Sequence, residues 1–310
     1  MIEIFKIVDE ELQEAKDNED GIWVNIINPT SEEISAFSEK FQIPIDFFQD
    51  SLDPYERSRI EIKDEIIMII LKIPVFNKRG EDVPFVTFPI GIVFTKNAVI
   101  TICSEKVEIL SDFLEGKVRG FSIKNEISFL LNLFSHTASL YLKYLKEISN
   151  IISYEEERLQ KTMRNEELMK LLDIQKGLVY FSTALKTNEF VMKRIKNKKI
   201  IELTEKDEDF LDDILIENRQ AIEMASIYTD ILRDMMGAFS SIISNNLNVI
   251  MKFLTSITLI LTIPALIAGI YGMNVELPLE HFPYAFAFVI GFSFVITTIM
   301  TFIFRRKGLL

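Results

Sequence analysis

The sequence is poor in the residues that most often carry out catalysis. It has one cysteine, Cys103, and two histidines among 310 residues. A single cysteine excludes an internal disulfide, and its place in the apolar run "NAVITIC" predicts a buried structural thiol. His136 lies in the helical stretch "LFSHTASL" and His281 beside an apolar segment, with no Cys or Ser partner evident for either. The pattern therefore does not indicate an enzyme.

Excess positive charge and phosphate-binding loops are also missing. The chain has 34 Lys and Arg against 46 Asp and Glu, a net charge of -12, which argues against a nucleic-acid partner. It has no Gly-x-x-x-x-Gly-Lys-Ser/Thr or Gly-x-Gly-x-x-Gly loop, so no nucleotide cofactor is expected. The N-terminal stretch "MIEIFKIVDEELQEAKDNED" carries acids instead of a basic region and an apolar core, which predicts no cleaved signal peptide.

Charge is absent from two segments near the C-terminus. No charged residue lies between Lys252 and Glu276, or between His281 and Arg305, and each gap is 23 residues long. As helix, such a segment is about 35 Å long, enough to cross a hydrocarbon core of about 30 Å. We therefore predict two transmembrane helices. A buried soluble hairpin would also be apolar, but two such segments in succession favour the membrane.

The flanking charges predict the orientation in the membrane. Lys252 precedes the first segment and a basic run follows the second, whereas the connector offers Glu276 and Glu280 with no Lys or Arg. The positive-inside rule then places both termini in the cytoplasm and the connector outside. We expect a multi-pass protein of the cell membrane whose N-terminal part is cytosolic.

Residues 1–124 show a mixed pattern that predicts a cytosolic α/β domain. "EIFKIVD", "GIWVNIIN", "IEIKDEIIMIILKIPVF" and "FVTFPIGIVFTKNAVITIC" are typical of strands, with breaks near Asp64 and at Lys96-Asn97. "NPTSEEISAFSEKF" predicts a helix opened by a capping box of Thr30 and Glu33. Three prolines in the strand region are expected at sheet edges or bulges: Pro74, Pro84 and Pro89.

After residue 124 the pattern becomes helical. Through Leu247 there is no proline and the only glycines are Gly177 and Gly237. We predict helices over about 125–163 and 166–198, antiparallel within a 125–203 segment, and a stalk helix over 204–248 capped by Thr204. The stalk should continue into the first span as one rod of about 100 Å. Its apolar positions need neighbours, from self-association or from the two preceding helices: Leu211, Ala225, Leu232 and Phe239 in one row, Ile214, Ala221, Tyr228, Met235 and Ile242 in the other.

The first span carries a polar face. At about 100° per residue, eight positions fall within about a third of the circumference, and most are polar or small. Close packing between transmembrane helices, with hydroxyls bonded to their own backbone, explains such a face, and so does an ion path shared by several copies. The span has no carboxylate, so a cation would cross largely hydrated. The face consists of Asn248, Met251, Thr255, Thr258, Thr262, Ala265, Gly269 and Met273.

The first span ends in the motif Tyr271-Gly272-Met273-Asn274, followed by a short acidic loop, a second apolar segment and a basic tail. This order resembles the CorA family of magnesium transporters, whose signature is Gly-Met-Asn at this place. "IAGIYGMN" is close to a verbatim family string, and "DPYERSRIEI" from Asp53 resembles the family's Asp/Glu/Arg segment before a sheet hairpin.

The resemblance implies a homopentameric funnel in the lipid bilayer, with an α/β cytosolic domain, a long helical stalk and two C-terminal transmembrane helices. It divides the C-terminal part into a first span over 249–274, an outer loop over 275–281, a second span over 282–304 and a basic cytosolic tail over 305–310. Asn274 would form a ring that receives hydrated Mg²⁺, aimed by the turn at Gly272 and Met273. Lining residues would include Asn248, Thr262 and Ala265 together with the apolar gate pair Met251 and Leu254.

The resemblance also implies regulation. Arg305, Arg306 and Lys307 match a basic ring at the inner pore mouth and equally fit a positive-inside anchor. Cytosolic Mg²⁺ bound between subunits would hold the pore closed, with Asp213 and the adjacent Asp212 on the stalk. The partner would lie in the hairpin, where this chain departs from the family with Asn77 and then has Glu81 and Asp82. The same stalk acids also fit a solvated helix start that complements the helix dipole.

The sequence thus predicts a divalent cation channel or transporter, with Mg²⁺ both transported and regulatory and uptake driven by the membrane potential. Transport of Co²⁺, Ni²⁺ or Zn²⁺ remains an alternative, although the spans lack the His and Cys of a soft-metal site. A membrane-anchored coiled-coil scaffold that conducts nothing is the alternative from another class.

Overall fold

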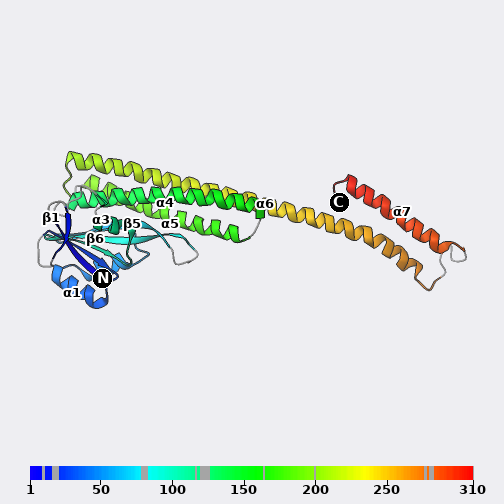
Figure 1. Ribbon diagram of the computed structural model, residues 1–310, viewed down its shortest axis with the longest axis horizontal. Coiled ribbons are helices and arrows are strands. Elements are labelled where there is room, and N and C mark those ends of the chain that lie inside the picture. Colours follow the sequence, from blue (N-terminus) through cyan, green and yellow to red (C-terminus); the bar gives the residue numbers. More distant parts are fainter. Residues whose placement is uncertain are drawn as a thin grey trace. The chain divides into compact units, whose positions relative to one another are not determined.

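The computed structural model describes residues 1–8, 11–15, 21–77, 83–115, 117–118, 126–162, 165–198, 200–275, 278 and 283–309. The chain divides into two compact units, Met1–Arg233 and Asp234–Leu310 (Figure 1). Five residues singled out in the sequence lie outside the described ranges: Glu81, Asp82, Glu276, Glu280 and His281.

Unit 1 is built on a mixed sheet. Its seven strands within the described residues run in the order β2-β1-β3-β7-β6-β5-β4, with β3 and β7 parallel and the other neighbours antiparallel. The strands are β1 (Ile2–Val8), β2 (Glu11–Glu14), β3 (Ile22–Ile27), β4 (Arg59–Lys63), β5 (Ile66–Phe76), β6 (Phe85–Phe94) and β7 (Ala98–Cys103).

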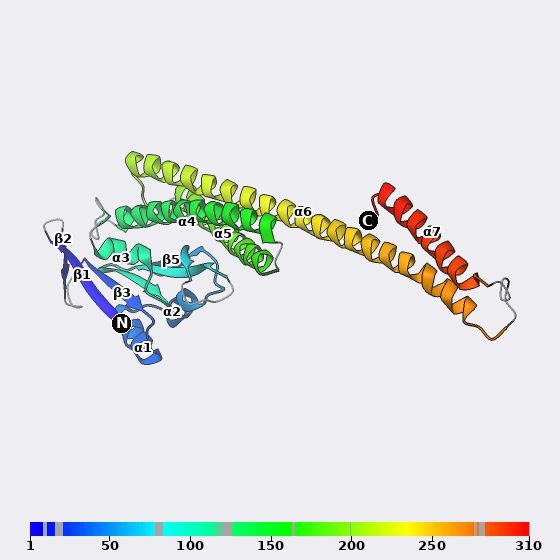
Figure 2. The same cartoon turned by 45° about the vertical axis from the view of Figure 1, so that its right-hand side comes forward.

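Helices cover both faces of this sheet. Successive strand residues point to opposite sides, so each strand contributes side chains to a core on each face. On one face Val24 packs in a core with Phe47 of α2 (Ile45–Leu52), next to α1 (Ser31–Phe41). On the other, Trp23 packs with Phe113 of α3 (Glu108–Leu114) and Phe129 of α4 (Glu126–Thr162). The helix α5 (Asn165–Lys198) lies beside α4 on this second face (Figure 2).

A buried polar joint fixes the helical layer to β5. Asn188 of α5 donates to the Lys72 carbonyl at 2.8 Å and accepts from the Lys72 N–H at 3.0 Å and the Ser58 hydroxyl at 2.6 Å. The Tyr141 hydroxyl of α4 donates to the same carbonyl at 3.1 Å. The Lys72 ammonium donates to the Pro54 carbonyl, and burial lowers its pKa although nearby carboxylates oppose this shift. The strand that leads to the β5–β6 hairpin is therefore held by both α4 and α5.

The stalk portion of α6 (Glu205–Tyr271) packs against the two preceding helices. Leu211 and Ile214 belong to the same core cluster as Ile195 of α5, and Asn218 donates to the Leu185 carbonyl at 3.1 Å. Of the apolar rows, Ala221, Ala225 and Leu232 are also buried, whereas Ile242 is 41% exposed. Packing against the preceding helices thus buries part of the two apolar rows, as expected.

The local signals read from the sequence are confirmed. The Thr30 N–H donates to Glu33 at 2.8 Å and the Glu33 N–H to the Thr30 hydroxyl at 3.2 Å, which completes the capping box. At the start of α6, the Asp207 N–H donates to the Thr204 hydroxyl at 3.3 Å. The predicted long helices are α4, α5 and α6.

The prolines of the β5–β6 hairpin lie beyond its neighbouring strands. Pro74 pairs with Thr87 and Pro89 with Lys72, whereas β4 pairs with hairpin residues 66–70 and β7 pairs with hairpin residues 91–94. The missing N–H groups therefore fall where no adjacent strand needs them, as the edge prediction required. Three short elements were not predicted, namely β2, α2 and α3.

Candidate functional site

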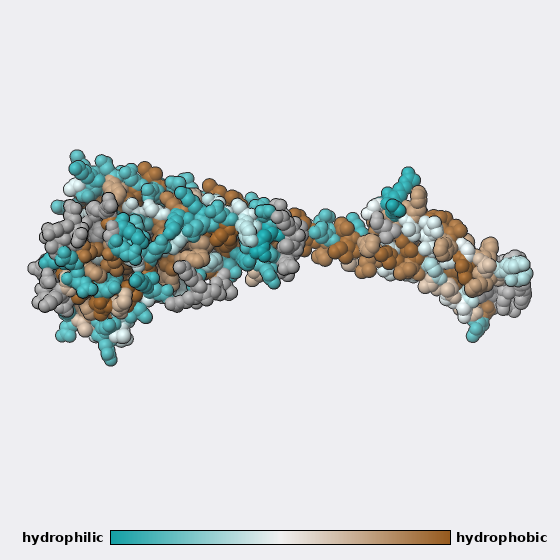
Figure 3. Space-filling model, in the orientation of Figure 1, coloured by the Kyte–Doolittle hydropathy of each residue, from teal (hydrophilic) through white to brown (hydrophobic). Residues whose placement is uncertain are grey.

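Unit 2 contains two helices with exposed apolar surface. The apolar end of α6 and the helix α7 (Ala285–Arg306) are each long and apolar enough to cross a membrane. No residue of α7 is buried, and hydrophobic side chains run along both helices (Figure 3). Soluble monomers rarely expose apolar patches of this extent, so the surface requires lipid or other protein. The apolar end of α6 and the helix α7 are therefore candidate membrane spans.

The predicted polar face of α6 lies on the side away from α7. Asn248, Thr258 and Thr262 are exposed, and so are the other members of that face. Ser256 is buried and Ile267 half-buried, and about 100° per residue puts these two on the opposite side of the helix. Within unit 2, α7 therefore covers the apolar side of α6 and leaves the polar face open to a partner.

Two threonines of this face bond to their own helix. The Thr258 hydroxyl donates to the Leu254 carbonyl at 2.8 Å, and the Thr262 hydroxyl donates to the Thr258 carbonyl at 2.7 Å. This geometry matches the helix-packing interpretation. It also suits an ion path, because each hydroxyl oxygen keeps lone pairs that can accept from the water around a cation.

The Gly-Met-Asn motif directly follows the last residue of α6. The helix ends at Tyr271, and the Gly272 N–H still donates to the Ala268 carbonyl at 2.9 Å. Gly272 does not have a positive φ, so the turn does not depend on left-handed backbone. A Cβ at this position would lie 3.3 Å from the Ala268 oxygen, so glycine permits close packing of the last turn. Asn274 follows with an exposed side chain.

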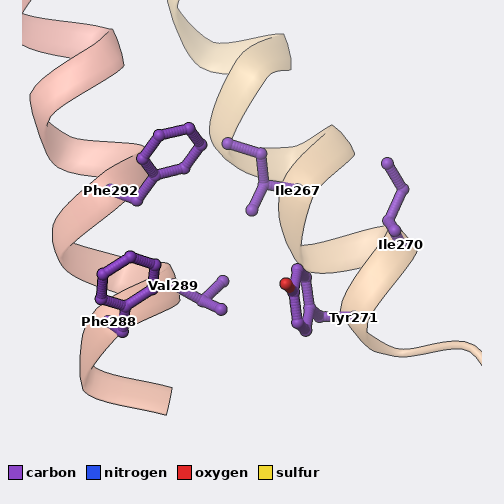
Figure 4. A pocket seen from close by; sticks show the side chains of 6 residues that line it. All are labelled: Ile267, Ile270, Tyr271, Phe288, Val289 and Phe292. Atoms are coloured by element: carbon purple, nitrogen blue, oxygen red, sulfur yellow. The ribbon is translucent and has the colours of Figure 1, made fainter. Parts of the chain in front are cut away.

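An apolar pocket of about 170 Å³ separates the two helices near this motif (Figure 4). Among its described lining residues, Tyr271 alone carries a side-chain oxygen, and this hydroxyl donates to the Pro278 carbonyl at 3.4 Å. Such a lining offers no ligand set for a hydrated divalent cation. The described lining of this pocket is therefore suited to apolar packing of the two helices. The lining residues are Ile267, Ile270, Tyr271, Phe288, Val289 and Phe292.

Two features of α6 were not predicted from the sequence. An open polar hollow extends the predicted face toward the N-terminal side of Asn248, at the same spacing of three and four that defines the face. Pro264 lies inside the helix and has no N–H for the Ile260 carbonyl, which leaves a backbone oxygen without its usual donor in mid-span. The hollow is lined by Ser240, Ser241, Ser244, Asn245 and Asn248.

Of the predicted regulatory residues, the structure describes Asp212 and Asp213 but not Glu81 and Asp82. Both carboxylate oxygens of Asp212 lie 2.5 Å from the Lys196 ammonium, and Asp213 is exposed. The Asn77 N–H donates to the Pro84 carbonyl at 2.8 Å, and the acids that follow it lie outside the described residues. The described part of the chain contains no group of three or more His, Cys, Asp or Glu suited to a metal.

The basic run closes α7. Arg305 and Arg306 form its last turn, where positive charge complements the helix dipole. Lys307 caps the helix, and its N–H donates to the Ile303 carbonyl at 3.0 Å. All three basic side chains are exposed.

Comparison with known proteins covers both units. Residues 18–306 match the family model described as CorA-like Mg²⁺ transporter protein. The cobalt/magnesium transport protein CorA of Methanocaldococcus jannaschii is 32% identical over 292 residues, 93% of this chain and 90% of that protein. The protein of the same name from Thermotoga maritima is 24% identical over 311 residues, 98% of this chain and 88% of that protein.

The fold is likewise that of a solved relative. The complete structure of the CorA magnesium transporter from Methanocaldococcus jannaschii superposes with a TM-score of 0.85 at 28% identity, covering 100% of this chain and 99% of that one. The family match, the identity along nearly the whole chain and the shared fold agree with the motif at the end of α6. The chain belongs to the CorA-like Mg²⁺ transporter family.

Proposed function

We propose that this protein is a divalent cation transporter that carries Mg²⁺ into the cell as a homopentamer. The observation that supports this most is the exposed polar face of α6, which leads toward Asn274 and lies opposite the side covered by α7. Copies arranged with these faces toward a common axis would enclose a polar path and leave α7 to the lipid. The relatives named cobalt/magnesium transport proteins support the choice of cargo.

The entrance of the path is the ring of Asn274 side chains. Mg²⁺ gives up its water reluctantly, so neutral amide oxygens that accept from bound water suit it better than carboxylates that would replace that water. Tyr271, Gly272 and Met273 set the position of Asn274 at the end of the helix. The ion is thereby recognised through its hydration shell, by the size of that shell and by the hydrogen bonds that its water donates.

Below the entrance, the open face of α6 lines the conduit. Its polar members can accept from a hydrated ion, and the apolar pair near the cytosolic end can close the path by dewetting. Residues 204–248 act as the stalk, 249–274 as the first span and 282–304 as the second. The lining consists of Asn248, Met251, Leu254, Thr255, Thr258, Thr262, Ala265 and Gly269, with Met251 and Leu254 as the gate.

The membrane potential drives uptake. An inward-moving divalent ion gains about 4.6 kcal/mol per 100 mV, twice the single-charge value, so no chemical fuel is required. The chain carries no nucleotide-binding loop. Both termini face the cytoplasm, and Arg305, Arg306 and Lys307 surround the inner mouth of the pore.

Cytosolic Mg²⁺ bound between subunits closes the pore. Asp213 is exposed and can face a neighbouring copy, whereas Asp212 must first leave Lys196. Glu81 or Asp82 of the neighbouring hairpin supplies the second carboxylate. Rising cytosolic Mg²⁺ then stops its own uptake.

Purified protein in liposomes loaded with a Mg²⁺-sensitive dye tests the proposal. A potential that is negative inside should accelerate Mg²⁺ entry, and external Co²⁺ or Ni²⁺ should compete if they share the path. Zn²⁺ entry without Mg²⁺ entry would mean that the transported ion is Zn²⁺ and would leave the proposed mechanism unchanged. A folded pentamer that passes none of these ions at any potential would contradict transport and favour a membrane-anchored scaffold.

A further inference from the structure

Two buried carboxylates lie between α4 and α5 in unit 1. Glu155 of α4 is 5% exposed and Glu167 of α5 is 1% exposed. The Arg158 guanidinium contacts both, at 3.0 Å to Glu167 Oε1 and 3.7 Å to Glu155 Oε1. The Lys170 ammonium lies 3.5 Å from Glu155 Oε1. A single guanidinium thus joins two acids that are almost closed to solvent.

These contacts leave half of each carboxylate unsatisfied. Among the residues that the structure describes, Oε2 of Glu155 and Oε2 of Glu167 are buried and have no hydrogen-bond partner. The contacts of Glu155 at 3.5 and 3.7 Å are also longer than a charge-assisted hydrogen bond of about 2.7–2.9 Å. A buried oxygen without a partner is destabilising, and more so when it carries charge, so the pair has a strong requirement for a further positive or donor group.

The two basic side chains that pair with these acids can move away from them. The side chains of Arg158 and Lys170 are 38% and 53% exposed, so both can turn into water. One divalent cation would carry the same charge as the two side chains that it replaces. Exchange of the two basic groups for one ion therefore keeps the cluster neutral and can satisfy the oxygens that are now unpartnered.

We propose that Glu155 and Glu167 form a divalent cation site within the α4–α5 helix pair. The ligands are carboxylate oxygens only, and no other group of metal-binding residues joins them in the described ranges. Two carboxylates with the remaining positions filled by water are a typical shell for Mg²⁺ and unsuitable for a soft metal. Arg158 and Lys170 occupy the site when the cation is scarce and are released when it binds.

The site lies within one chain and does not rest on the proposed transport activity. It differs from a site between subunits, which would use exposed acids of two copies. Its ion would join α4 to α5 directly, so the helix pair should be more stable at high cytosolic Mg²⁺ than at low Mg²⁺.

The chain allows a local measurement of this binding. Cys103 is fully buried and burial raises the pKa of its thiol to about 12, so a new cysteine elsewhere can be labelled selectively. Met169 is 55% exposed and two residues from Glu167, which makes Met169→Cys a suitable position for a nitroxide. Paramagnetic Mn²⁺ bound nearby will reduce the nitroxide signal of the full-length protein, and Mg²⁺ will compete.

In the labelled protein we expect saturable loss of signal that excess Mg²⁺ reverses. The double change Glu155→Gln and Glu167→Gln should raise the Mn²⁺ midpoint by about tenfold or more, equivalent to about 1.4 kcal/mol. Arg158→Gln should lower the midpoint, because it removes the competing cation. Asp173→Asn is the matched control, since this acid lies on the same helix but is paired with Lys176 at 2.8 Å.

The double Gln protein and Arg158→Gln should shift the Mn²⁺ midpoint in opposite directions. Either variant therefore tests the proposal if the other fails to fold. An unchanged midpoint in the double Gln protein, or a raised midpoint in Arg158→Gln, would overturn the proposal. Those results would mean that the free oxygens are satisfied by water only. The fluorescence of Trp23, buried in unit 1, checks that each variant is folded.

Discussion

Gly177 lies where α5 touches the sheet, and Gly177→Ala should destabilise unit 1. A Cβ at this position would lie 2.8 Å from the Phe85 carbonyl oxygen and 3.2 Å from the Phe85 Cβ. Both atoms belong to strand β6, so neither can move aside as a flexible side chain would. Inserting a methyl group into such a contact costs about 1–3 kcal/mol, and here the upper half of that range applies.

Helix propensity acts in the opposite direction. Alanine is favoured over glycine inside a helix by about 1 kcal/mol, which leaves a net destabilisation of about 1–2 kcal/mol. For a unit of this size, such a loss lowers the melting temperature by about 3–6 °C. The fluorescence of Trp23, the only tryptophan, reports the thermal unfolding of unit 1 in detergent.

The matched control is Gly237→Ala in α6. A Cβ there meets nothing within 4 Å, so this variant should be neutral or more stable. If Gly177→Ala melts at or above the temperature of the unchanged protein, the close approach of α5 to β6 is not rigid and the reasoning fails.

Three further predictions concern unit 1. Burial raises the pKa of Cys103 to about 12, so about one molecule in ten thousand should carry the thiolate at pH 8. We therefore expect Cys103 to react with thiol reagents only after unfolding, and fast labelling of the folded protein would contradict its burial. The Lys143 ammonium holds the pKa of Glu108 below its usual value, so stability gained above about pH 4.5 is lost as the pH falls through the lowered pKa. Glu108→Gln should therefore lose less stability on acidification, by under about 1 kcal/mol because the pair is solvent-screened, and an unchanged pH profile would argue against the ion pair. Asn188→Leu should cost about 2–4 kcal/mol by leaving the Lys72 carbonyl and N–H poorly paired, and a melting curve like that of the unchanged protein would refute this role.

Local chemistry made much of the fold predictable. The capping box at Thr30 and the cap at Thr204 place two helix starts through bonds to residues three positions away. The strands follow from alternating or continuous apolar runs, and the membrane helices from segments without charge. The family resemblance, carried by the motif at 271–274, is confirmed by the match over residues 18–306.

The missed elements lacked such local signals. Helix α2 begins after Pro44 and α3 after Val107, and neither start has a side-chain cap. Strand β2 is a four-residue segment, Glu11–Glu14, with the sequence "ELQE". These elements form because tertiary neighbours supply what their own sequence does not.

The site was predictable in part for the same reason. The spacing along α6 indicated the polar face, but only the structure places α7 on the other side of the helix. The burial of Glu155 and Glu167 depends on how α4 packs against α5, and their sequence surroundings resemble any solvated helix surface. The role of Asn274 and of the lining residues stays a prediction.

Mg²⁺ flux through Asn274→Ala in liposomes tests the central claim most directly. The side chain is exposed at the end of α6, so its truncation should leave the fold and assembly intact. If a ring of Asn274 amides receives the hydrated ion, the variant should assemble normally and its potential-driven Mg²⁺ entry should fall by about tenfold or more, a loss of at least about 1.4 kcal/mol of stabilisation. Flux equal to that of the unchanged protein would contradict the account.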